Sequence, residues 1–235
     1  MTWLFQPIPA SAALGPGPSE TGTTLNPADK DTGIVLSNGN FTMNGPAGNW
    51  GVVRATSTRS GKRYFEATLD LVGLGVCVGF ANPSAPLSGA WVGSSTNGVG
   101  YFHSGYVTYN WATQDGPYAV ASSGSVIGCA IDTASGKAWW SVDGVWQNGD
   151  PAAGTGGFTA SGLGNIVHAA LSAVDTGAKA SANFGASAWA YGPPGGFTGW
   201  DTGAPETVYK GVAWPTFYRG TRTDSQLYKG TGILH

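Results

Sequence analysis

The sequence predicts an all-β protein, an antiparallel two-sheet β-sandwich of the jelly-roll type. Turn formers are abundant, with 39 Gly and 14 Pro in 235 residues. Strong helix formers are scarce, since glutamate occurs only as Glu20, Glu66 and Glu206, while strand-favouring aromatic residues are common. No stretch keeps a 3.6-residue apolar period with caps, and short apolar segments alternate with turn signals. This pattern is typical of a sandwich of many short strands.

The first half of the chain contains three strand signals. Asn38-Gly39 between apolar residues predicts a hairpin, because both residues accept a positive φ. In residues 64–71 the odd positions are apolar and the even positions carry Tyr, Glu, Thr and Asp. This period of two predicts a strand with one buried face. Residues 74–81 are almost continuously apolar, which predicts a central strand covered on both sides.

The second half predicts further strands and two long loops. Residues 99–111 are expected to form two short strands around Ser104-Gly105, and residues 126–142 a hairpin with its turn at 133–136. Asp143-Gly144 closes another tight turn. Residues 165–174 and 178–185 supply the last strands, since flanking glycines and β-branched residues favour strand over helix. Residues 82–98 and 110–124, rich in Gly, Ser and Pro, are expected to be loops.

The two cysteines, Cys77 and Cys129, each lie in an apolar run. We interpret them as reduced thiols buried in the core. The alternative is a disulfide between neighbouring strands.

Five motifs follow one another along the chain. They are GKRYFEATL (61–69), VCVGFANP (76–83), the hairpin from Gly124 to Trp146, ANFG (182–185) and YGPPGGFTGW (191–200). In this order they resemble the SPRY domain family, over residues 25–200. The resemblance implies a SPRY-like β-sandwich that binds its ligand through loops at one end. We expect Phe65, Trp139 and Phe184 to fill the space between the sheets. Asn183 is expected to offer its amide to a neighbouring strand, and Pro193-Pro194 to fix the exit of the chain.

The opening of this region, residues 25–45, resembles the start of SPRY-like modules in bacteriophage virion proteins. This resemblance implies a virion protein that is assembled in the host cytoplasm. Its partners would be other virion proteins and further copies of itself, in a cyclic homo-oligomer.

The residues indicate no catalytic or metal centre, so we expect neither enzyme activity nor a cofactor. The chain has three histidines, His103, His168 and His235, and no zinc-ligand spacing. Asp132, Asp143 and Asp150 surround one hairpin and are interpreted as turn residues that bond nearby backbone. A calcium site or a glycosidase carboxylate pair is the alternative.

Aromatic residues in and beside the two long loops are the candidate ligand contacts. Aromatic side chains on loops suit protein hot spots and sugar stacking alike. The candidates are Trp91, Tyr106, Tyr109, Trp111 and Tyr118.

Residues 1–24 are expected to form an N-terminal arm. Trp3, Leu4 and Phe5 make an apolar plug, and a stretch rich in Pro, Gly and Ser follows. The plug either folds back on its own domain or enters another subunit. No basic region precedes it, so a secretory signal is not expected.

Residues 201–235 are expected to form a C-terminal tail with three similar units at 208–211, 217–220 and 227–230. Each unit is an apolar residue, Tyr, a cation and Gly. The candidate assembly residues are Tyr209, Lys210, Tyr218, Arg219, Tyr228 and Lys229. The tail either packs on the sandwich as a small β-meander or docks on a neighbouring subunit, and docking is favoured.

These features favour a bacteriophage virion structural protein, a tail-tip or fibre component for host-surface attachment or subunit docking. A host glycan or protein is the expected ligand. The first alternative is a head decoration or connector subunit without a host ligand, and the second is a carbohydrate-active enzyme. A net charge of −2 without a basic run argues against nucleic acid. The absence of an apolar run near 20 residues argues against membrane insertion.

Overall fold

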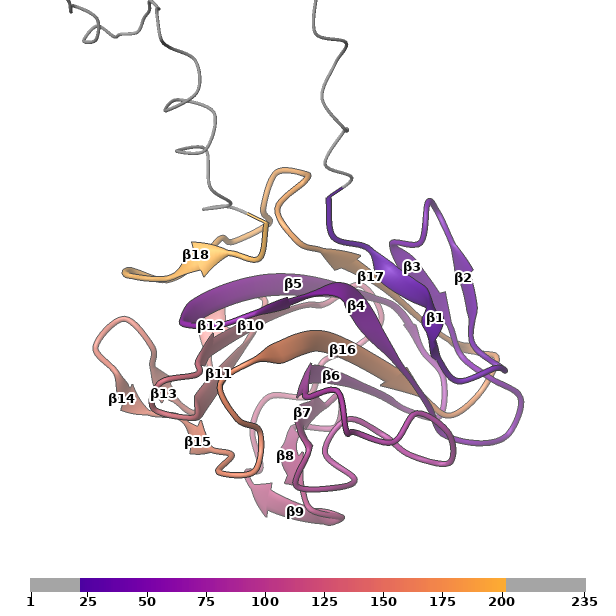
Figure 1. Ribbon diagram of the computed structural model, residues 1–235, viewed down its shortest axis with the longest axis horizontal. Helices are drawn as coiled ribbons and strands as arrows, with labels where there is room; N and C mark the ends of the chain where they lie inside the picture. Colours follow the sequence, from indigo (N-terminus) through magenta and orange to yellow (C-terminus); the bar gives the residue numbers. More distant parts are fainter. Residues whose placement is uncertain (1–21, 202–235) are drawn as a thin grey trace, which may run out of the picture.

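The computed structural model describes residues 22–201, and all the regular elements in this range are β-strands. Two large sheets pack face to face (Figure 1). No helix in this part of the chain is long and apolar enough to span a membrane. The predicted all-β antiparallel sandwich is confirmed, with one parallel pairing, between β18 and β5.

Sheet A has seven strands. In spatial order they are β1 (Leu25–Lys30), β4 (Gly51–Arg59), β16 (Val167–Ala173), β6 (Val76–Ala81), β7 (Gly98–Phe102), β8 (Tyr106–Tyr109) and β9 (Ala112–Asp115). Strand β6 is buried along its whole length, as predicted. The prediction of a loop at 110–124 is partly wrong, because β9 pairs with β8 and forms the edge of the sheet.

Sheet B has nine strands around the long strand β5. In spatial order they are β12 (Val145–Trp146), β11 (Lys137–Val142), β10 (Val126–Asp132), β5 (Lys62–Val72), β17 (Ala178–Asn183), β3 (Thr42–Asn44) and β2 (Val35–Ser37), with β15 (Phe158–Thr159) beside β11 and β18 (Thr198–Gly199) beside β5. A separate short hairpin joins β13 (Gly149–Asp150) and β14 (Thr155–Gly156). The predicted hairpins β2–β3 and β10–β11 are both present.

The main core fills the space between the two sheets. Phe65 and Phe184 lie in it as predicted, with ring centroids 5.9 Å apart. The prediction for Trp139 is wrong, because Trp140 is the residue that enters this core. Adjacent residues of a strand face opposite sides. Trp139 therefore lies on the outer face of sheet B, where its indole N–H donates to Thr155 O.

The segment 184–200 begins and ends in the main core, with Phe184 and Trp200. Between these residues it crosses the outer face of sheet B, where Trp189 packs against Tyr64. It buries Tyr64 and Glu66, so the prediction of one buried face for β5 is wrong in this half of the strand. The Glu66 carboxylate accepts four hydrogen bonds, from Tyr64 O–H and from the backbone N–H groups of Ala190, Tyr191 and Gly192, at 2.8–2.9 Å. These bonds satisfy a buried charge and fix the covering segment.

Irregular chain also covers the outer face of sheet A. The loop 82–97 packs on it and encloses a second apolar cluster that includes Val52, Cys77 and Ala170. Arg54 holds the start of the loop: it donates to Asn82 O and Ala85 O at 2.9 Å and pairs with Asp29. The sandwich is therefore four layers thick, with a regular sheet at each inner layer.

The cysteines are free and buried, as predicted. Cys77 belongs to the outer cluster on sheet A, and Cys129 belongs to the core between the sheets. Burial raises the pKa of the Cys77 thiol to about 12, which keeps it protonated and unreactive.

Polar residues singled out in the sequence mostly have local structural roles. Asp132 and Asp150 accept hydrogen bonds from backbone N–H groups two residues ahead, as expected for turn residues. Asp143 accepts from Val126 N–H across its hairpin. The expectation for Asn183 is wrong: its amide donates to Ser187 O and Ala188 O in the following turn, not to a neighbouring strand.

The two ends of the described chain meet. Thr23 and Asp201 are joined by backbone and side-chain hydrogen bonds, and Arg59 pairs with the same carboxylate at 3.1 Å. Ser57 also contacts the Thr23 hydroxyl. We call these four residues the terminal clasp. The first and last residues of the described range therefore lie side by side.

Candidate functional site

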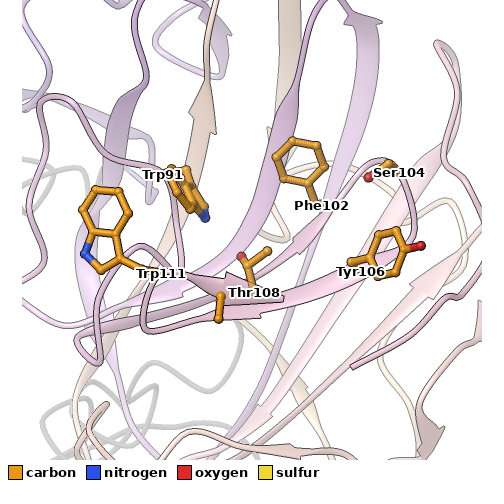
Figure 2. A pocket seen from close by; sticks show the side chains of 7 residues that line it. Trp91, Phe102, Ser104, Tyr106, Thr108 and Trp111 are labelled. Carbon is orange, nitrogen blue, oxygen red and sulfur yellow. The ribbon is translucent and has the colours of Figure 1, made fainter. Parts of the chain in front are cut away.

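An aromatic groove of about 220 Å³ opens on the outer side of sheet A. Its lining comes from the loop 82–97, from β7 and β8, and from the turn into β9 (Figure 2). The lining residues are Trp91, Phe102, Ser104, Tyr106, Thr108, Trp111 and Ala112. No carboxylate, imidazole or cationic side chain is among them, so the groove offers aromatic faces and hydroxyl groups.

Strand β8 supplies the floor through its alternation. Tyr106 and Thr108 face the groove, whereas Val107 and Tyr109 face the core between the sheets. The Thr108 hydroxyl donates to Val92 O at 3.0 Å and so ties the loop to the strand. Gly93 is needed at this contact, because a Cβ there would lie 2.3 Å from Thr108 O and its φ is +106°.

Trp91 is held by neighbouring rings. Its ring centroid lies 5.8 Å from that of Trp50 and 4.9 Å from that of Trp111, the latter edge to face. Trp50 in turn contacts Phe102 at 5.6 Å. The Trp91 indole nitrogen is buried and has no hydrogen-bond partner among the described residues. A buried donor without a partner destabilises the folded state by about 1–3 kcal/mol, and such donors are uncommon in folded proteins.

Trp111 is the exposed wall of the groove, with 61% of its surface accessible. Asn110 and Trp111 both have positive φ, 54° and 66°, as in a type I′ hairpin turn. The second of these positions is usually Gly, and a bulky residue there is strained. The backbone N–H of Trp111 donates to Gly93 O at 3.2 Å. The fold therefore presents a large aromatic side chain at a position where its own stability favours glycine.

The structure brings together three of the five predicted ligand contacts and separates the other two. Trp91, Tyr106 and Trp111 line the groove. Tyr109 faces the core, where its ring contacts Phe158 at 5.5 Å and its hydroxyl accepts from Gly162 N–H. Tyr118 stacks on Tyr101 and donates to Asp115; burial, with help from Asp115, raises the pKa of Tyr118 to about 12. The prediction that Tyr109 and Tyr118 are ligand contacts is not supported by this placement.

Sequence reasoning missed Phe102 and Thr108. Phe102 follows Tyr101 in a strand of period two, so one of the two had to face outward. The signal that could have identified Phe102 was an apolar ring at a position that faces outward. The predicted assembly residues Trp3, Leu4, Phe5, Tyr209, Lys210, Tyr218, Arg219, Tyr228 and Lys229 lie outside the described residues.

Two neutral histidines lie near these elements. His103 follows β7, and its Nδ1 accepts from Val76 N–H at 3.3 Å, while burial lowers its pKa. His168 on β16 is buried, and its Nδ1 lies 2.8 Å from Ala55 O, so this nitrogen carries the proton. Burial lowers the pKa of His168 as well. Within residues 22–201 no three His, Cys, Asp or Glu side chains are grouped as metal ligands.

Solved structures with this architecture are SPRY domains. The SPRY domain of human HERC1 covers 70% of this chain and 99% of its own length, with 15% identity and a TM-score of 0.57. A second human SPRY domain covers 68% of this chain and 99% of its own, with 18% identity and a TM-score of 0.53. The chain has the SPRY fold. No protein-family model matches the sequence, and no curated protein matches it.

The SPRY fold explains the order of the sequence motifs. GKRYFEATL forms most of β5, VCVGFA forms β6, and the hairpin motif forms β10 to β12. Strands β5, β6 and β10 of these motifs occupy the centres of the two sheets, so their residues specify packing, whereas β12 lies at an edge. The groove residues come from between these motifs, in segments that fold-level likeness does not interpret.

Proposed function

We propose that this protein is a non-catalytic binding protein whose SPRY-type sandwich presents the aromatic groove to an extended segment of a partner protein. The observation that carries the proposal is Trp111: a strained, exposed tryptophan that forms one wall of a groove. Strain of this kind persists where the side chain has a use that outweighs its cost. An exposed aromatic anchor beside a pocket is also the typical centre of a protein-binding hot spot.

The size of the groove favours a peptide segment. About 220 Å³ is less than the roughly 300–1,000 Å³ of a small-molecule pocket. It suits one or two side chains of a longer ligand, with hydroxyl groups of Ser104 and Tyr106 at its margin. Stacking of a sugar ring on Trp111 is the competing reading.

We further propose that the binding domain serves in a bacteriophage virion, as a tail-tip or fibre component that attaches to a host surface or docks subunits. Support comes from the phage-like opening at residues 25–45 and from the terminal segments that flank the domain. A head decoration or connector subunit without a host ligand is the alternative. Mass spectrometry of purified particles tests the virion role. Several copies per particle are expected, and a chain found only outside particles overturns it.

The binding role is tested by replacing Trp111. Trp111→Gly removes the anchor and also relieves the positive-φ strain, so stability should change by no more than about 1 kcal/mol. Wild-type protein should select sequences from a displayed peptide library, and Trp111→Gly should lose at least tenfold in affinity for them.

Tyr191→Ala is the matched control, because Tyr191 is 53% exposed but belongs to the segment covering sheet B. It should bind like wild type. Selection of glycans instead of peptides, lost in Trp111→Gly, would assign the groove to sugars. Equal binding by wild type and Trp111→Gly would remove the groove from the function.

A further inference from the structure

We propose that the groove of one copy receives the C-terminal tyrosine–cation units of a second copy. These units are residues 208–211, 217–220 and 227–230, each an apolar residue, Tyr, Lys or Arg, and Gly. The proposal rests on the proposed function, since it names the partner segment that the groove binds. In this contact the C-terminal segment of one copy binds the groove of the next, so the two copies use different surfaces and associate head to tail.

The chemistry of the groove matches these units. Trp91, Tyr106 and Trp111 provide aromatic faces, and Phe102 closes the space between them. A Lys or Arg side chain over such faces gains cation–π attraction, which is about 0.5–2 kcal/mol depending on desolvation. The adjacent Tyr can stack edge to face in the same groove. No Lys or Arg side chain lines the groove, so the lining does not repel the cation of the unit.

Net charge favours the same pairing. Residues 22–201 contain more Asp and Glu than Lys and Arg. In residues 202–235 the balance is reversed, with Lys210, Arg219, Arg222 and Lys229 against Glu206 and Asp224. Opposite net charges steer the C-terminal segment toward the sandwich of a neighbour.

The first unit lies too close to Asp201 along the chain to reach the groove of its own copy. Strand β18, two residues before Asp201, lies at the opposite end of the sandwich from β8 and β9 in Figure 1. Tyr209 is eight residues beyond Asp201, a span of at most about 28 Å. A domain of this size is roughly 40 Å across. The first unit is therefore available only to another copy.

The repetition has a physical use. Tyr209, Tyr218 and Tyr228 are nine and ten residues apart, roughly 30 Å when extended. When one unit dissociates from the groove, another unit of the same segment is close enough to bind in its place. Three weak units on one segment therefore raise the overall affinity without a new contact. A head-to-tail contact closes into a ring or extends as a chain of subunits.

Sedimentation velocity of the full-length protein tests the proposal by complementation. Wild type should associate as its concentration rises, and less so at high salt. Trp111→Gly, which lacks the groove anchor, and the triple variant Tyr209→Ala, Tyr218→Ala, Tyr228→Ala, which lacks the inserted rings, should each stay monomeric. An equimolar mixture should associate without forming rings or extended chains, because only one variant keeps the units and only the other keeps the groove. Tyr191→Ala should associate like wild type.

The outcomes separate this proposal from the proposed function. Monomeric wild type that still selects library peptides in a Trp111-dependent way would leave groove binding standing and overturn docking between copies. Association that persists in Trp111→Gly would also overturn it. A melting temperature lowered in the triple variant, without a change in association, would place the units on their own sandwich and overturn it.

Discussion

At the residue scale, most buried charged and imidazole groups of the described chain have a specific partner, whereas the Trp91 indole nitrogen has none. The His168 imidazole bonds Ala55 O on the outer side of sheet A, close to the pair of Arg54 and Asp29. Arg54 lowers the pKa of Asp29, through a hydrogen bond and its charge. His168 and His103 are both held neutral by burial. The two histidines link folding to pH in one window, and Asp29 links folding to pH in a lower window.

We predict that the free energy of unfolding falls as the pH drops from 7 to 5. The folded-state pKa values of His103 and His168 are lowered, so the unfolded chain takes up protons near its ordinary pKa of about 6.5 before the folded chain does. Each histidine adds at most about 1.4 kcal/mol per pH unit. The contribution of Asp29 is lost only below its ordinary pKa of 3.8, outside this window. Urea titrations across the range measure the slope.

The double variant His103→Gln, His168→Gln should flatten this slope. An unchanged slope in the double variant would assign the effect to carboxylates and contradict the prediction.

At the element scale, two irregular segments complete the sandwich. The loop 82–97 covers sheet A and is held by Arg54, and the segment 184–200 covers sheet B and is held by Glu66. Each anchor is a charged group that bonds the backbone of the covering segment. In the loop 82–97 further hydrogen bonds add to this anchor, among them those from Val52 N–H to Leu87 O and from the Thr108 hydroxyl to Val92 O.

Glu66→Gln should loosen the segment 184–200. The amide nitrogen would face a backbone N–H or the Tyr64 hydroxyl, so a buried donor loses its acceptor, at a cost of about 1–3 kcal/mol. Hydrogen exchange should quicken at Ala190 to Gly192, and the midpoint of urea unfolding should fall. Asp132→Asn, at an exposed turn, is the control and should change stability by less than about 1 kcal/mol. Equal effects of the two changes would refute the anchoring role.

The elements were largely predictable from the sequence because their signals are local. Period two, turn residues and apolar runs located the hairpins and the central strand β6, and they kept residues 166–174 from being read as a helix. The errors came from long-range contact. Nothing local indicates that residues 189–192 would bury Glu66, nor which of Trp139 and Trp140 faces the core. Likewise, the groove forms where the loop 82–97 meets the β8–β9 hairpin, and no local sequence signal indicates that contact.

At the scale of the whole molecule, strands β8 and β9, which carry groove residues, lie at one end of the sandwich, and the two ends of the described chain lie at the other (Figure 1). The terminal clasp joins residues that are 178 positions apart. The groove residues therefore lie away from the terminal clasp. This arrangement is compatible with the proposed binding role.

Deletion of residues 204–235 should leave a folded domain that unfolds in one cooperative transition. Both sheets, the apolar cores and the terminal clasp are formed by residues 22–201, so the deletion removes no residue that builds them. Asp201→Ala in the shortened chain should cost about 1–3 kcal/mol, because Thr23 and Arg59 lose their shared acceptor. Calorimetry measures both effects. A shortened chain that does not fold, or an Asp201→Ala change without cost, would contradict this description.

The closeness of Thr23 and Asp201 has a practical consequence for protein engineering. A domain whose ends are adjacent fits into a surface loop of a host protein without stretching it, and it tolerates joining of its natural ends. Here the joint would lie beside the Arg59 pair, far from β8 and β9. The sandwich can thus be transplanted as a cassette, or circularly permuted at an exposed hairpin tip, with its groove left in place.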